Sequence, residues 1–249
     1  MNNNLFSIGP LTIHTYGVMV GLGILCAWLL ADHRARRAGL SSETLDSLVV
    51  CCLVSGYIGA KLLYWVTRAG DIVHDPSILL ELTTGFVVYG GILGGFAGTL
   101  LYCRRHKQPF LQYADLAMPS IALAQGIGRI GCLEAGCCYG VCTSLPIAVT
   151  YTTSTQAPNG VALFPVQALC SVLDLALCLV LLAVARRPHR AGTVLLVYMM
   201  GYSAGRFAIE FLRGDSIRGS VGTLSTSQCI ALLVLCASVV TAIVRRRRS

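Results

Sequence analysis

The chain has 249 residues, of which 55% are hydrophobic and 12% are charged, and its mean hydropathy is +0.71. Soluble domains carry about 25% charged residues, so this composition excludes a soluble enzyme, a disordered chain and a fibrous protein. The net charge of +8 would suggest nucleic acid in a soluble protein, but membrane proteins acquire basic loops for topological reasons, and we expect no nucleic-acid partner.

Apolar runs long enough to cross a bilayer, which takes roughly 20 residues, recur along the whole chain. They predict an all-α polytopic membrane protein with seven transmembrane helices near residues 13–31, 46–67, 84–103, 112–131, 164–185, 193–212 and 224–244. Because little sequence remains for a soluble domain, we expect one seven-helix domain over residues 1–249. The start of the chain has neither a basic region nor a small-residue cleavage site, so we expect the first helix to stay in the mature protein.

Basic residues predict the orientation of these helices. Of the 19 Lys and Arg residues, 13 lie in four clusters that follow the first, third, fifth and seventh apolar runs, near residues 34–37, 104–107, 186–190 and 245–248. Odd-numbered helices end on one face, and the positive-inside rule places that face in the cytoplasm. The N-terminus is then outside and the C-terminus cytoplasmic.

The other six basic residues lie within the helices or toward the outer face, where topology does not favour them: Lys61, Arg68, Arg129, Arg206, Arg213 and Arg218. A basic residue at the bilayer centre costs roughly 2.5 to 3.5 kcal/mol, so such residues usually face a wet or ligand-filled cavity. We therefore take Arg129, Arg206 and the nearby Glu210 as the leading site residues.

Glycines recur every four residues in the third predicted helix, at 90, 94 and 98 and again at 91 and 95. Such spacing lets two helices approach closely, and it also lets a lipid headgroup reach the backbone; the spacing alone favours helix packing. A weaker pair occurs at Gly17 and Gly21.

The longest connection between predicted helices covers residues 132–165 and lies outside on this topology. Its β-branched stretch at 148–153 predicts a short strand or hairpin in a small extracytoplasmic head. The head also holds four cysteines, at positions 132, 137, 138 and 142, whose spacing matches no zinc signature. Disulfides between unspecified pairs, a thiol nucleophile and metal binding by a set of ligands without that signature remain open from the sequence.

Arg129 stands among three glycines in the segment at 126–131. A guanidinium there suits a phospholipid phosphate, although an arginine snorkelling to the headgroups is the alternative. In the sixth predicted helix Arg206, Glu210 and Arg213 share one face, either as a structural ion pair or with Glu210 orienting an arginine that binds an anion. Arginines on two separate helices favour an anionic lipid as the ligand.

Seven motifs in register carry a resemblance over nearly the whole chain: IGPLTIHTYG at 8–17, GYIGAKLLYW at 56–65, GFVVYGGILGG at 85–95, ADLAMPSIALAQGIGRIG at 114–131, FPVQAL at 164–169, GYSAGRFAIEFLRGD at 201–215 and LSTSQ at 224–228. Together they resemble the prolipoprotein diacylglyceryl transferase family of bacterial inner membranes.

The resemblance implies a multi-pass enzyme of the bacterial plasma (inner) membrane. It would move diacylglyceryl from phosphatidylglycerol to the lipobox cysteine of a prolipoprotein signal peptide and release glycerol 1-phosphate, with no cofactor and no metal. Carried over, Arg129 holds the lipid phosphate, Arg206 is the second essential arginine with Glu210 beside it, and Tyr16 and Gly140 fall on family positions.

The chain departs from the family at three site positions. It has Tyr89 where the family shows histidine in a His-Gly-Gly, and Cys132 and Cys137 where the family shows asparagine and glutamate. A tyrosine of ordinary pKa near 10 donates a hydrogen bond but is a poor base at neutral pH. Two alternatives therefore stand beside the transferase: a paralogue that moves a lipid group to another acceptor, and a non-catalytic protein that binds or transports phospholipid. A thiol or redox membrane protein on the same scaffold is a third.

The predicted site has two sets of residues. The catalytic set is Arg129, Arg206, Glu210 and Tyr89. The substrate-binding set is Arg129 with Tyr16, His14, Gly90, Gly91, Gly140 and Arg213.

Overall fold

The computed structural model describes residues 4–8, 11–81, 83–215, 220–221 and 224–247. The chain forms two compact units, one made of Met1–Ala31 with Ala114–Ser249 and the other of Asp32–Tyr113.

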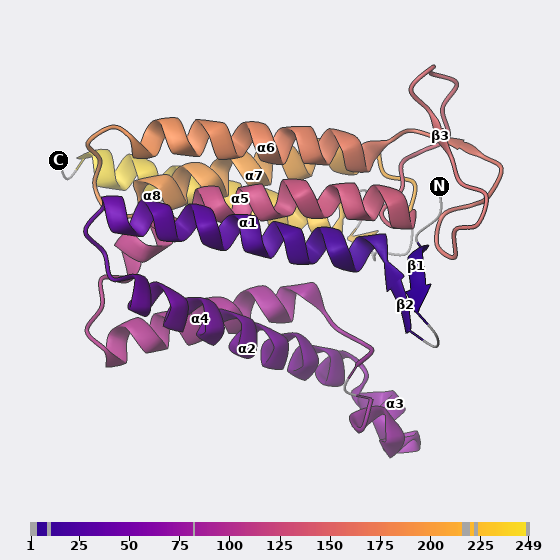
Figure 1. The fold of residues 1–249 in the computed structure, drawn as a ribbon, viewed down its shortest axis with the longest axis horizontal. Coiled ribbons are helices and arrows are strands. Elements are labelled where there is room, and N and C mark those ends of the chain that lie inside the picture. Colours follow the sequence, from indigo (N-terminus) through magenta and orange to yellow (C-terminus); the bar gives the residue numbers. More distant parts are fainter. Residues whose placement is uncertain (1–3, 9–10, 82, 216–219, 222–223, 248–249) are drawn as a thin grey trace. The chain divides into compact units, whose positions relative to one another are not determined.

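Seven long helices occur where the apolar runs predict them (Figure 1): α1 Thr15–Arg37, α2 Ser42–Thr67, α4 Val88–Arg105, α5 Phe110–Ala135, α6 Val166–Ala185, α7 Thr193–Glu210 and α8 Thr226–Arg247. Of these, α1, α2, α5, α6 and α8 are long and apolar enough to cross a membrane. The mostly helical membrane class is thus confirmed, while the count of seven spans, the orientation and the single domain stay predictions.

Short antiparallel strand pairs lie at the helix ends. They are β1 Asn4–Ile8 with β2 Leu11–His14, β3 Val149–Thr150 with β4 Ala162–Leu163, and β5 Ser220–Val221 with β6 Leu224–Ser225. Strand β3 falls inside the stretch at 148–153 where the sequence predicts one. The pairs before α1 and α8 are not predicted, because strands of two to five residues beside a long apolar run carry little period-2 signal of their own.

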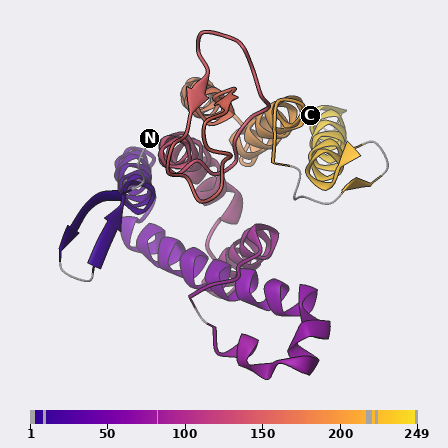
Figure 2. The same cartoon turned by 90° about the vertical axis from the view of Figure 1, so that its right-hand side faces the viewer.

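Helices α2 and α4 pack backbone to backbone in the unit Asp32–Tyr113 (Figure 2). A Cβ added at Gly59 would lie 2.9 Å from the Cα of Gly94, and one added at Gly90 would lie 2.7 Å from the Cβ of Leu63. The glycine spacing of the third predicted helix is therefore used for helix packing. Gly17 and Gly21 differ, because a Cβ at either position would meet nothing within 4 Å.

Lys61 holds the segment that leads into α4. Its side chain, only 3% exposed, donates from Nζ to the carbonyl oxygens of Glu81, Thr84 (2.7 Å) and Gly85 (3.4 Å). The same ammonium lies 5.3 Å from the ring centroid of Phe86. Gly85 has a φ of +69°, a conformation that glycine adopts without strain. A short helix, α3 Ala69–His74, and a 3-10 turn, η1 Pro76–Leu79, precede this segment.

In the other unit, α5, α6 and α7 surround an apolar core that includes Ala122, Leu181 and Val194. Asp115 of α5 caps the start of α7, because its carboxylate accepts from the backbone N–H groups of Gly192 at 2.6 Å and Leu195 at 2.8 Å. Such a cap supplies partners to helix N–H groups that would otherwise have none. This bond network fixes the position of α7 beside α5.

Candidate functional site

A cavity of about 100 Å³ lies among α5, α6 and α7. Its lining comes from all three helices: Arg129, Cys170, Leu173, Asp174, Leu177, Gly201, Tyr202, Gly205, Arg206 and Ile209. Two of the predicted site residues, Arg129 and Arg206, thus meet at one cavity although they come from different helices. The volume suits a small polar group such as a phosphate and not a whole lipid.

Close helix packing positions Arg129. A Cβ at Gly126 would lie 2.8 Å from the Cγ of Leu175, and the hydroxyl of Ser171 donates to the Gly126 carbonyl at 2.8 Å, so α5 contacts α6 there. A Cβ at Gly131 would lie 3.3 Å from the Cα of Tyr16, so α5 also contacts α1. Within the described ranges Arg129 forms no hydrogen bond or ion pair. Its guanidinium is therefore open to an anionic ligand.

Arg206 has a charged partner on its own helix. Its Nη1 lies 2.5 Å from Oε2 of Glu210, whose other oxygen accepts from the Ser225 hydroxyl at 2.8 Å. Both Nη atoms of Arg206 and Oε2 of Glu210 are buried and form no hydrogen bond in the part of the chain that the structure covers. The contact is thus ionic without hydrogen-bond geometry, and the guanidinium keeps N–H groups for a ligand.

Arg213 follows the last turn of α7 and is bound by an aspartate. Its Nε and Nη2 contact the two oxygens of Asp215 at 2.8 and 2.5 Å, and Nε lies 3.8 Å from Glu210. The predicted shared face of Arg206, Glu210 and Arg213 is therefore confirmed, with Glu210 between the two arginines. Because Arg213 already has a bidentate partner, it is a weaker anion ligand than Arg129.

Gly140 joins the head to the end of α7. The N–H of Val141 donates to the Leu212 carbonyl, and the N–H of Gly214 donates to the Tyr139 carbonyl, each at 3.0 Å. A Cβ at Gly140 would overlap the backbone carbonyl oxygen of Phe164, so a larger residue does not fit there without a shift of the backbone. The structure gives Gly140 this packing role, and its substrate-binding role stays a prediction.

Three cysteine thiols gather where α5 ends. Gly136 and Cys138 have φ angles of +72° and +57°, which turn the chain back, and the Cys137 thiol donates to the Cys132 carbonyl at 3.7 Å. No disulfide occurs among the described residues, nor any group of His, Cys, Asp or Glu that could hold a metal. Hydrogen bonds with the Cys132 and Cys137 thiols, together with the Arg213 guanidinium, hold the pKa of the Cys138 thiol below its ordinary value.

Tyr151 anchors the head to the cysteine segment. Its hydroxyl donates to the Leu133 carbonyl at 2.8 Å, and Gln167 of α6 donates to the Cys137 carbonyl at 2.8 Å. Burial raises the pKa of Tyr151 to about 12, so the phenol stays neutral and can donate at every physiological pH. The spacing of the cysteines alone could not reveal this arrangement.

Five further predicted residues are not among those that line the cavity. Tyr89, Gly90 and Gly91 lie at the start of α4, in the unit Asp32–Tyr113. Their roles in the site stay predictions. His14 ends β2 and Tyr16 lies in the first turn of α1; both side chains are exposed. Arg218 lies outside the described residues.

Asp174 lines the cavity but is not among the site residues predicted from the sequence. It stands in the middle of α6, and its position in an apolar run predicts only a cap or a bond within the bundle. Its presence beside both arginines is visible only once the helices are packed. The signal available beforehand is the presence of a carboxylate inside a membrane-length helix.

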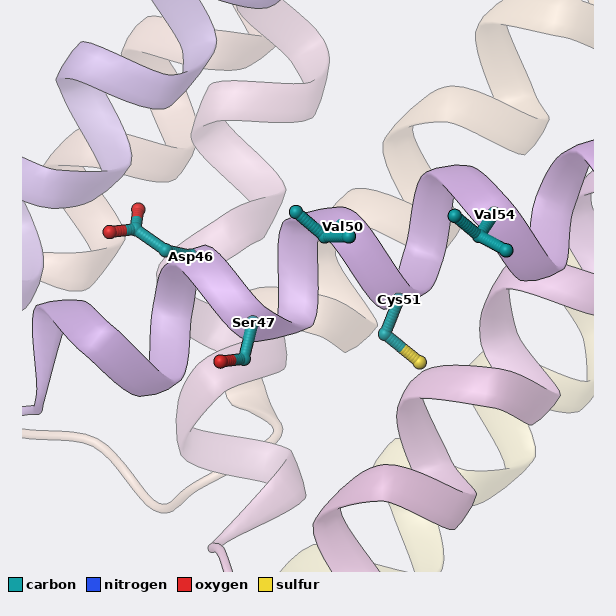
Figure 3. A pocket seen from close by; sticks show the side chains of 5 residues that line it. All are labelled: Asp46, Ser47, Val50, Cys51 and Val54. Carbon is teal, nitrogen blue, oxygen red and sulfur yellow. The ribbon is translucent and has the colours of Figure 1, made fainter.

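A larger hollow of about 540 Å³ carries no site. Residues of α2 alone line it: Asp46, Ser47, Val50, Cys51 and Val54 (Figure 3). They follow one surface of a single helix and bring together no residues from separate elements. We therefore take the cavity of α5, α6 and α7 as the candidate site.

Comparison with known proteins shows the family to which the chain is similar. The family model for prolipoprotein diacylglyceryl transferase matches residues 3–244. The chain is 43% identical, over 93% of its length and 92% of the relative, to the phosphatidylglycerol–prolipoprotein diacylglyceryl transferase of Clostridium tetani. It is 44% identical to enzyme 2 of that name from Clostridium perfringens, over 93% of this chain and 90% of the relative. It is 30% identical to the enzyme of the same name from Staphylococcus carnosus, over 97% of this chain and 89% of the relative.

Proposed function

Because the chain belongs to the prolipoprotein diacylglyceryl transferase family, we propose that it moves the diacylglyceryl group of phosphatidylglycerol onto the lipobox cysteine of a prolipoprotein signal peptide. Among the residues, the proposal rests on one observation: Arg129 and Arg206 line the same cavity. Arg129 forms no ion pair there among the described residues. Such a pair of arginines suits the phosphate of an anionic lipid.

The arginines act on the bond that breaks. Attack of the peptide thiolate at the glyceryl carbon forms a C–S bond and releases glycerol 1-phosphate, whose phosphate oxygen takes the electron pair of the broken C–O bond. Charge on that oxygen grows in the transition state, and fixed guanidinium groups stabilise it. Arg129 would contact the phosphate directly, while Arg206, oriented by Glu210, would contact it from α7.

The proposed reaction also depends on which side of the membrane the cavity faces. Seven spans with the N-terminus outside would place the head, residues 132–165, on the outer face of the bacterial plasma membrane. The cavity lies near the ends of α5 and α7 that adjoin this head. A lipid headgroup and a lipobox peptide would then approach from the same side, with the head above the cavity.

Purified protein in phosphatidylglycerol vesicles with a synthetic lipobox peptide tests the proposal. Glycerol-phosphate release together with a diacylglyceryl mass gain of the peptide is the expected result. Glycerol-phosphate release without a mass gain of the peptide would show that the diacylglyceryl group goes to another acceptor. Lipid binding without any release would overturn the enzyme and favour a binding or transport protein. A peptide with serine in place of the lipobox cysteine is the matched control and should gain no mass.

A further inference from the structure

Transfer to a thiol requires that the thiol lose its proton, and the described site has one group suited to accept it. We propose that Asp174 is the general base that deprotonates the lipobox cysteine. This inference rests on the proposed function and adds a residue to it. Asp174 is the only carboxylate among the cavity-lining residues within the described ranges, and its residue is 8% exposed.

The other carboxylates near the site are already engaged. Glu210 contacts Arg206 and accepts from Ser225, and Asp215 contacts Arg213 through both oxygens. Asp174, by contrast, forms no hydrogen bond or ion pair within the described part of the chain. Its lone pairs are therefore available to a substrate proton, as a general base requires.

Depth along the helices agrees with this role. Asp174 lies eight residues after Val166, the first residue of α6, which is roughly 12 Å at 1.5 Å per residue. Arg129 lies six residues before Ala135, the last residue of α5, which is roughly 9 Å. The carboxylate and the phosphate-binding guanidinium thus reach the cavity at similar levels, on α6 and α5.

Other charged or titratable side chains line the cavity together with Asp174. They are Arg129 on α5, Cys170 on α6, and Tyr202 and Arg206 on α7. Arg129 is the cationic group among them that no ion pair within the described residues offsets, and a nearby opposite charge favours the ionised, proton-accepting form of a carboxylate. A carboxylate that faces the phosphate-binding arginines from another helix can hold the thiol between itself and the reacting carbon.

The step balances in protons and electrons. The S–H bond breaks, and its proton goes to a carboxylate oxygen of Asp174. The sulfur electron pair forms the C–S bond as the C–O bond to phosphate breaks, and the phosphate oxygen keeps that pair. The proton on Asp174 then passes to the departing glycerol phosphate, which restores the carboxylate.

A selenol peptide distinguishes a base from a structural carboxylate, since a selenol is already ionised at neutral pH. With the cysteine peptide, Asp174→Asn should lower kcat/KM by about 10² to 10⁴-fold, the usual contribution of a general base. With a selenocysteine lipobox peptide most of that loss should disappear. Asp174→Glu, which keeps a displaced carboxylate, should retain part of the thiol activity and its pH profile.

The matched control is Asp115→Asn, a second buried aspartate of the same unit that caps α7 and does not line the cavity. It should lower thermal stability and leave the ratio of selenol to thiol rates unchanged. If Asp174→Asn loses activity equally with the cysteine and the selenocysteine peptide, Asp174 is not the general base. If Asp174→Asn fails to accumulate in the membrane, the ratio of selenol to thiol rates is measured in Asp174→Glu instead, and that ratio then tests whether Asp174 is the base. A wild-type protein that releases no glycerol phosphate would instead refute the proposed function.

Discussion

The guanidinium of Arg206 lies 2.5 Å from the carboxylate of Glu210, one turn further along α7. This pair cancels most of the charge that α7 brings to the cavity, and Asp215 does the same for Arg213. Arg129 therefore supplies the positive charge that no ion pair within the described residues offsets. The two arginines are thus unequal: Arg206 is paired with Glu210, and we expect Arg129 to be the main phosphate ligand.

The two adjacent glycines at the start of α4 should respond differently to alanine. A Cβ at Gly90 would lie 2.7 Å from Leu63 Cβ, whereas one at Gly91 would lie 3.5 Å from the Gly56 carbonyl oxygen, an ordinary contact. We expect Gly90→Ala to cost about 1 to 3 kcal/mol of stability and Gly91→Ala to leave it unchanged. Thermal unfolding in detergent measures both. Equal unfolding temperatures would show that Gly90 is not a packing residue.

Removing the Lys61 ammonium should loosen the segment that leads into α4. Lys61→Met leaves the carbonyl groups of Glu81, Thr84 and Gly85 without their donor, at a cost of about 1 to 3 kcal/mol for a buried group that loses its partner. Limited proteolysis should then cut between residues 80 and 87 in the variant and not in the wild type. Arg68→Met, which removes only an exposed ion pair with Asp71, is the control and should leave the cleavage pattern unchanged.

The Cys138 thiol should stay reactive in mildly acidic solution. Its hydrogen bonds with the Cys132 and Cys137 thiols, and the Arg213 guanidinium, favour the thiolate and lower its pKa. A thiolate of lowered pKa persists as the pH falls below about 8.5, where an ordinary thiol becomes protonated. Alkylation of Cys138 at pH 6, followed by mass spectrometry, should thus outpace that of free cysteine.

The matched variant for this test is Arg213→Gln, which removes a positive charge and keeps an amide. It should move the pH profile of Cys138 alkylation to higher pH, because one cause of the lowered pKa is gone. A profile identical to that of free cysteine in the wild type would contradict the account of the cluster.

The sequence predicts the long helices well because each is a continuous apolar run. Periodicity likewise places Arg206, Glu210 and Arg213 on one face, since that relation lies within a single stretch of chain. Contacts between helices are different. Neither the access of Asp174 to the cavity of Arg129 nor the three donor bonds of Lys61 leaves a local pattern, because each joins residues from separate elements.

The cysteines illustrate the same limit. Their spacing leaves disulfides, a nucleophile and metal binding all open, and only the turn made by Gly136 and Cys138 brings the thiols of Cys132, Cys137 and Cys138 together. Backbone conformation at two positions decides this arrangement. The resemblance to a family could not supply it, because the family shows other residues at two of these positions.

The direct test of the central claim is phosphatidylglycerol turnover by Arg129→Ala beside Arg129→Lys and the wild type, in vesicles with the cysteine lipobox peptide. Losing a charged hydrogen-bond donor from a transition state costs about 10²- to 10³-fold, so Arg129→Ala should release glycerol phosphate at least that much more slowly. Arg129→Lys should recover only part of the rate, because lysine cannot bind phosphate through two fixed N–H groups. Full turnover by a folded, membrane-inserted Arg129→Ala would contradict the assignment of this cavity as the phosphate site.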